Sequence, residues 1–205
     1  MGKRSSSFER READFYPTPF KAVPPLIPYL RRDGINTFAE VCAGDGDLIR
    51  HLESFGLKCV HSGDIRTGQD ALAIKRYAGN PDAGITNPPF KYPEDPARTA
   101  RLLRDLIQRF LDLGLPFYLL LPHDWSANKG SASFLRRCTD IIAIGRIKWI
   151  PNSEHSGGYE NSTWVRFDPN YRGDPAFHND RGVRAQIKRV PSIAEAAEYG
   201  ALPND

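Results

Sequence analysis

Residues 36–64 read N-T-F-A-E-V-C-A-G-D-G-D-L-I-R-H-L-E-S-F-G-L-K-C-V-H-S-G-D, and this stretch decides the fold. Its beginning predicts a short strand that runs into a glycine turn at 44–46. Apolar residues then recur at helical spacing over 48–55, and Gly56 is typical of a helix end. Residues 57–62 predict a second strand. Strand, tight turn, helix and strand form the repeating unit of parallel α/β folds.

The same rhythm continues downstream. A third short strand is predicted at 83–86 and a helix at 95–113, followed by the apolar run 117–121, which is typical of a strand buried on both faces. Two further strands are predicted at 141–150 and 161–167, as an antiparallel edge. We therefore predict an α/β fold with a mainly parallel central sheet, an antiparallel edge and helices on both faces.

Proline is frequent in the segment before the first strand. Thr18 and Pro19 resemble a helix N-cap followed by proline at the first helical position. Pro24, Pro25 and Pro28 are expected to keep any helix there short or broken, because proline lacks the backbone N–H that a helix interior needs.

Length and composition predict one domain. A chain of 205 residues, 40% hydrophobic and 26% charged, suits a single globular core. We expect a flexible N-terminal segment over 1–14, a domain over 15–167 and a polar C-terminal tail over 168–205. No apolar run approaches the ~20 residues that a membrane-spanning helix needs, and the first residues lack the apolar stretch of a signal peptide. The expected location is the cytoplasm, without a membrane partner.

The charge distribution and the possible metal ligands are less informative about function. The net charge of +3 does not indicate nucleic acid by itself. Basic residues gather in the first eleven positions and after 165, where they could contact phosphates or form solvated tails. The three cysteines have no metal-ligand spacing and the five histidines are scattered, so we predict no metal site. The sequence does not predict an oligomeric state.

The glycine turn has the features of a cofactor site. Gly44 and Gly46 let the backbone turn tightly and lie close to a ligand. Asp64 ends the second strand 20 residues after Gly44, a spacing that suits a carboxylate accepting from ribose hydroxyls. A dinucleotide-binding G-x-G-x-x-G motif fails at Ile49, and Glu40 suits a cation better than a diphosphate. The residues favour S-adenosylmethionine, which joins a positive charge, a ribose and an adenine; a plain tight turn is the alternative.

The segment Asn87-Pro88-Pro89-Phe90 follows the strand predicted at 83–86. Two prolines make a stiff corner there. An aromatic amine is a poor nucleophile because its lone pair is delocalised. The Asn87 side-chain oxygen and the Pro88 carbonyl could accept both amine hydrogens and favour a pyramidal nitrogen, while Phe90 stacks on the base. A proline loop with a capping asparagine is the less favoured alternative, because this segment follows a strand and lies downstream of the glycine turn.

These segments resemble the amino-group DNA methyltransferases of the N6-adenine type, and the small size is similar to that of phage-encoded members. Residues 40–46 are similar to the family's cofactor loop, 87–90 match its catalytic tetrapeptide, and 16–19 look like its Thr-Pro segment, which contacts the methionine carboxylate. The resemblance covers roughly residues 15–167. It implies the Rossmann-like class I methyltransferase fold and S-adenosylmethionine as the cofactor, with no metal.

The resemblance also implies roles for single residues. Asp64 falls on the ribose-binding acid and Asp70 on the acid that meets the adenine amine. The implied cofactor-binding residues are Tyr16, Thr18, Pro19, Glu40, Cys42, Ala43, Gly44, Gly46, Asp64, Asp70 and Asn87. The implied catalytic residues are Asn87, Pro88, Pro89 and Phe90.

The chain departs from sequence-specific members of the family because it has no room for a separate target-recognition domain. Loops at 122–130 and 152–160 are the candidates for substrate recognition. The candidate nucleic-acid-binding residues are His123, Trp125, Lys129, His155 and Tyr159. A core position is the alternative for Trp125.

The predicted function is methylation of the exocyclic amine of a nucleobase, with adenine N6 in DNA favoured over RNA. The same tetrapeptide suits amino groups of RNA bases and of protein glutamine, because a planar amide or aromatic amine is all that it demands. A catalytically inactive methyltransferase fold that binds nucleic acid is a further alternative.

Overall fold

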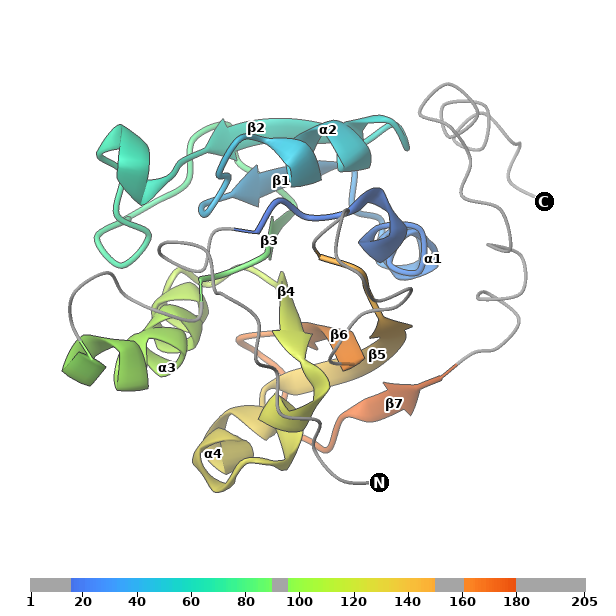
Figure 1. Cartoon of the computed structure of the whole chain (residues 1–205), viewed down its shortest axis with the longest axis vertical. Coiled ribbons are helices and arrows are strands. Elements are labelled where there is room, and N and C mark those ends of the chain that lie inside the picture. Colours follow the sequence, from blue (N-terminus) through green and yellow to red (C-terminus); the bar gives the residue numbers. More distant parts are fainter. Residues whose placement is uncertain (1–15, 90–95, 150–160, 180–205) are drawn as a thin grey trace.

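The computed structural model describes residues 16–89, 96–149 and 161–179, and a seven-stranded sheet lies at its centre (Figure 1). The strands lie in the order β2-β1-β3-β4-β6-β5-β7. Their bounds are β1 Thr37–Glu40, β2 Lys58–Ser62, β3 Ala83–Thr86, β4 Phe117–Pro122, β5 Cys138–Arg146, β6 Asn161–Phe167 and β7 Ala176–His178. The expected terminal segments at 1–14 and beyond 179 lie outside the described residues.

Parallel pairing dominates one half of the sheet and antiparallel pairing the other. β1 pairs in parallel with β2 and β3, and β3 pairs in parallel with β4. β6 then lies antiparallel to both β4 and β5, which confirms the expected antiparallel edge. β7 adds a short strand parallel to β5 at a position where the sequence predicts only a polar tail. β5 also begins earlier than the predicted 141, at Cys138.

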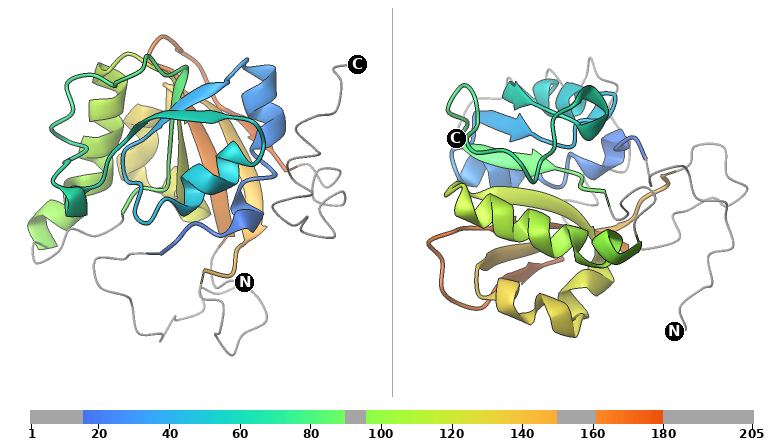
Figure 2. Two further views of the ribbon diagram at one scale, coloured as in Figure 1. Left: turned by 90° about the horizontal axis from the view of Figure 1, so that it is seen from above. Right: turned by 90° about the vertical axis from the view of Figure 1, so that its left-hand side faces the viewer.

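Helices cover both faces of the sheet, as expected (Figure 2). Their bounds are α1 Ile27–Arg32, α2 Asp47–Glu53, α3 Pro96–Asp112 and α4 Ala132–Leu135, with short 3-10 turns η2 Phe20–Ala22, η3 Ile65–Thr67, η4 His123–Ala127 and η5 Lys129–Ser131. Within the described part of the chain, every helix is too short or too polar to cross a membrane.

β4 shows how the two faces are built. Phe117, Leu119 and Leu121 belong to the apolar cluster that packs under α3, whereas Tyr118 and Leu120 belong to the cluster under α1 and α2. The alternation follows from the two-residue period of a strand. Because both faces are covered, the run is apolar throughout, as its sequence indicates.

The segment before β1 differs from its prediction in one respect. Thr18 is not a helix N-cap, because the residue before η2 is Pro19 and makes no side-chain capping bond. The hydroxyl of Thr18 instead contacts a residue of the candidate site described below. The expected shortness of the helix is confirmed, since α1 has six residues with Pro28 in its first turn.

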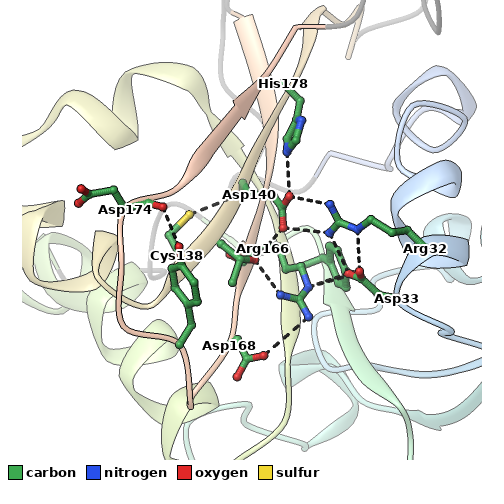
Figure 3. Close-up of polar contacts among 11 residues, drawn as sticks. Arg32, Asp33, Cys138, Asp140, Arg166, Asp168, Asp174 and His178 are labelled. Carbon is green, nitrogen blue, oxygen red and sulfur yellow. Dashed lines mark hydrogen bonds and ion pairs between the residues drawn. The ribbon is translucent and has the colours of Figure 1, made fainter.

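A partly buried ion-pair network lies near the amino ends of β4 and β5 (Figure 3). Asp140 accepts from Arg32 at 2.9 and 3.0 Å and contacts His178 at 2.8 Å. Asp33 pairs with Arg166 at 2.8 Å. Burial opposes ionisation of Asp140, but these hydrogen bonds outweigh it and lower its pKa to about 2. The network joins α1, β5, β6 and β7 at the edge opposite the candidate site.

Candidate active site

Three loops leave the same edge of the sheet. β2, β1 and β3 are neighbours and run in parallel, so the segments after Ser62, Glu40 and Thr86 emerge side by side. In open α/β sheets this carboxyl edge is where ligands bind. The two motifs singled out in the sequence, 40–46 and 87–90, therefore begin next to each other.

The glycine turn after β1 is tight and requires its glycines. Gly44 and Gly46 have φ angles of 55° and 79°, a region that side chains with a Cβ rarely adopt. The N–H of Gly46 donates to the Ala43 carbonyl at 2.8 Å, and the N–H of Ala43 donates to the Gly63 carbonyl at 2.9 Å. The turn is thus fixed both internally and to the end of β2, and α2 starts directly after it.

Asp64 lies against this turn. Its Oδ2 accepts from the Gly44 N–H at 2.8 Å, and its Oδ1 accepts from the N–H and Nε of Arg66 at 2.9 and 3.1 Å. Burial opposes ionisation of Asp64, but these donors outweigh it and hold its pKa below the ordinary value. The carboxylate is therefore ionised.

Glu40 is the buried acid of the site, with 1% of its surface exposed. Its Oε1 accepts from the Cys42 N–H at 2.9 Å and from the Thr86 hydroxyl at 2.5 Å. Burial raises the pKa of Glu40 to about 8, and the donors from Thr86 and Cys42 act in the opposite direction. The Glu40–Thr86 bond joins the end of β1 to the residue that precedes Asn87.

Asn87 is half-buried and contacts the segment at 16–18. Its Nδ2 donates to Thr18 Oγ1 at 3.2 Å and to the Tyr16 carbonyl at 3.5 Å. Thr18 is 6% exposed. The structure thus brings together the 16–19 segment, the glycine loop and the Asn-Pro-Pro corner, while Phe90 lies outside the described residues.

The other expected cofactor residues lie around this centre. Asp70 Oδ1 accepts from the Leu72 N–H at 2.9 Å, so the carboxylate stabilises its own turn after η3. Burial, followed by the charge of Glu40, raises the pKa of the Cys42 thiol, which therefore remains neutral. Pro19 precedes η2 and is half-buried.

The residues expected to recognise the substrate differ in how buried they are. Trp125 is only 7% exposed and lies edge-on to Phe167, with ring centroids 5.7 Å apart, which is the core position that the sequence also allows. His123 is half-buried against Phe177, and Lys129 is exposed on η5. The remaining candidates, His155 and Tyr159, lie outside the described residues.

Two solved structures share this arrangement of strands and helices. A candidate RNA methyltransferase from Pyrococcus horikoshii matches with 15% identity and a TM-score of 0.53, over 80% of this chain and 93% of that chain. A candidate class I S-adenosylmethionine-dependent methyltransferase from Listeria monocytogenes matches with 15% identity and a TM-score of 0.54, over 89% of this chain and 71% of that chain.

The fold is that of the class I methyltransferases. The expected fold is thereby confirmed. No family model matches the sequence, and no curated protein matches it.

Two polar residues at this edge of the class I methyltransferase fold are absent from the sequence-based site. Thr86 is 2% exposed and bonds to Glu40, and a polar residue that ends the short strand 83–86 is a signal that could have found it. Arg66 bridges Asp64 and Asp45, at 3.1 Å from each. An exposed arginine in a turn gives no such signal, because only the folded loop places it beside both carboxylates.

Proposed function

We propose that this protein transfers a methyl group from S-adenosylmethionine to the exocyclic amine of a nucleobase, with adenine N6 in DNA as the first candidate substrate. The observation that supports this most is the Glu40–Thr86 hydrogen bond, at 2.5 Å. It holds the Asn87-Pro88-Pro89 corner beside the glycine loop, so a ligand on the loop would lie next to the corner.

The residues at the edge fit the cofactor by their chemistry. Gly44 and Gly46 have no side chain to keep a ligand from the backbone, and Asp64 is an ionised carboxylate that is proposed to accept from ribose hydroxyls. Asp70 is proposed to meet the adenine amine. Glu40 is a buried acid with a pKa of about 8, and a positive charge nearby would lower that pKa and favour its carboxylate form. When bound, S-adenosylmethionine supplies a methyl group activated by a positively charged sulfur.

The corner would then orient the acceptor. The Asn87 side-chain oxygen and the Pro88 carbonyl would accept the two hydrogens of the amine, which directs the nitrogen lone pair toward the methyl group. The N–C bond would form as the bond between the methyl group and sulfur breaks, the electron pair of that bond would stay on sulfur as a neutral thioether, and the amine would lose its extra proton to solvent. Phe90 is proposed to stack on the base once it has left the duplex, a step that costs a few kcal/mol and less in single strands.

RNA is the second candidate substrate, because one of the two similar structures is of a candidate RNA methyltransferase. His123 and Lys129 lie on η4 and η5, directly after β4, where they could contact phosphates or bases. His155 and Tyr159 are proposed to join them. The amide of a glutamine side chain would fit the same corner, so protein remains an outcome of the test.

The test is transfer of tritiated methyl from S-adenosylmethionine to duplex DNA, single-stranded DNA, RNA and protein, with nucleoside analysis of the product. We expect label in N6-methyl-2′-deoxyadenosine of a DNA substrate. Label in an RNA base or in glutamine would show that the substrate is RNA or protein, with the same transfer of a methyl group to a planar NH2 group. Tight binding of S-adenosylmethionine with no transfer to any of the four, or no binding at all, would contradict the proposal.

A further inference from the structure

The Asn87 side chain has a defined orientation. Its nitrogen lies 3.5 Å from the Tyr16 carbonyl and 3.2 Å from Thr18 Oγ1. A carbonyl oxygen can only accept, so the NH2 end of the amide must be the end that faces the 16–18 segment. Both described hydrogen bonds of the Asn87 side chain use this nitrogen, so neither of them occupies the oxygen.

The orientation decides what Asn87 can do. An amide has a donor end and an acceptor end of nearly equal size, and only the oxygen can accept a hydrogen from a target amine. A flipped amide would present N–H groups to N–H groups and push the amine away. An asparagine at this corner is therefore useful only if something holds its nitrogen on the far side.

We propose that Thr18 is a positioning residue that, together with the Tyr16 carbonyl, fixes the amide of Asn87 and so leaves its oxygen for the target amine. This inference rests on the proposed function. A hydroxyl can accept from Asn87 and still donate its own hydrogen elsewhere, so the role is compatible with a cofactor contact by Thr18.

Thr18 is well supported for such a role. It is 6% exposed and lies between Pro17 and Pro19, whose rings restrict the backbone. The segment that follows is anchored to β6, because the indole of Trp164 donates to the Ala22 carbonyl at 2.7 Å. Phe20 also stacks on Phe55, with ring centroids 5.7 Å apart.

The backbone of the corner is held independently of Thr18. Thr86 bonds to Glu40 and is part of the β3 ladder with β4. Removing the Thr18 hydroxyl is therefore expected to leave the Asn87 amide held only by the longer contact with the Tyr16 carbonyl, at 3.5 Å, without displacing its backbone. This separation makes the role testable with a near-isosteric change.

The test compares Thr18→Val with Thr18→Ser at saturating S-adenosylmethionine and nucleic acid. Loss of one neutral hydrogen bond is expected to lower kcat roughly fivefold to tenfold in Thr18→Val, and Thr18→Ser is expected to restore it to within about twofold of the wild type. Thr37→Val is the matched control, since it removes a hydroxyl that bonds to Asp82 at the opposite edge of the sheet. An unchanged kcat in Thr18→Val, or a loss that saturating cofactor removes, would overturn the inference.

The Asn87→Asp protein, as a second background for the Thr18 variants, separates loss of amide orientation from general disruption of the site. A carboxylate has two equivalent oxygens, so Asn87→Asp has no amide to flip. In that background Thr18→Val is expected to cost no more than about twofold in kcat. An equal cost in both backgrounds, or an Asn87→Asp protein without any turnover, would overturn the orientation argument.

A readout without turnover keeps this inference separate from the proposed function. The side-chain NH2 signal of Asn87 in a 15N–1H spectrum can be assigned by its absence in Asn87→Ala. We expect this signal to shift and to exchange faster with water in Thr18→Val but not in Thr37→Val. An unmoved signal would refute the role of Thr18, whereas failure of methyl transfer by the wild type would refute only the proposed function.

Discussion

Glu40→Gln is expected to change how stability depends on pH. The carboxyl of Glu40 has a pKa of about 8 in the folded protein against an ordinary value of 4.5, because burial disfavours its charged form. The folded state therefore binds more protons than the unfolded state in this interval. The stability that protonated Glu40 provides is fully present below pH 4.5 and is lost progressively as the pH rises to about 8. Glutamine resembles the protonated acid and does not titrate.

The magnitude follows from the two pKa values. Their difference corresponds to a loss of up to about 5 kcal/mol in the free energy of unfolding of the wild type, relative to that of Glu40→Gln, as the pH rises from 4.5 to 8 or above. Urea unfolding at several pH values measures this loss. Subtracting the free energy of unfolding of one protein from that of the other cancels the titration of every other group. Glu53→Gln removes an exposed carboxylate and is the control, with an expected change of about 0.5 kcal/mol or less. If the difference in the free energy of unfolding between Glu40→Gln and the wild type stays constant from pH 5 to pH 8, Glu40 does not titrate in this range and the prediction is wrong.

Three further predictions concern the fold and the corner. Asp140→Asn is expected to destabilise the protein by about 1–3 kcal/mol in urea unfolding, because Arg32 and His178 lose a charged partner. The folded pKa of Asp140 is about 2, so its contribution to the free energy of unfolding is present above pH 3.8 and is lost as the pH falls toward 2. An Asp140→Asn protein as stable as the wild type at neutral pH would show that the network does not stabilise the fold. Gly46→Ala is expected to cost about 1–2 kcal/mol through its φ of 79° and not through a clash, since a Cβ would meet only the end of the Arg50 side chain; an unchanged urea midpoint would contradict this. Thr86→Val is expected to lower kcat by roughly tenfold or more because Glu40 no longer holds the corner, and full activity at saturating substrates would show that the bond is dispensable.

The sequence predicts the parts of this structure that depend on local patterns. The apolar run at 117–121, the helix within 95–113 and the glycine turn at 44–46 each have a period or residue type that is typical of the structure they adopt. The proximity of Asn87 to Glu40 is also predictable, because both residues end or follow parallel strands at one edge. These features require no knowledge of long-range side-chain contacts.

Other features depend on the folded chain and are not readable in advance. β7 has three residues and no alternating pattern, so its place beside β5 comes from long-range pairing. The hydroxyl of Thr18 is a plausible helix cap in the sequence, but the folded segment turns it toward Asn87. Trp125 after a strand suits a binding surface or a core, and only the packing against Phe167 decides between them.

We propose that the glycine loop and the Asn87 corner form one site for methyl transfer. A crystal structure of the protein with S-adenosylmethionine would show whether they do. We expect the ribose at Asp64 and the methyl group facing the space beside the Asn87 side-chain oxygen, where a nitrogen could approach to about 3–3.5 Å. Cofactor bound away from Gly44, or bound there with its methyl group turned from Asn87, would show that the loop and the corner do not form one site.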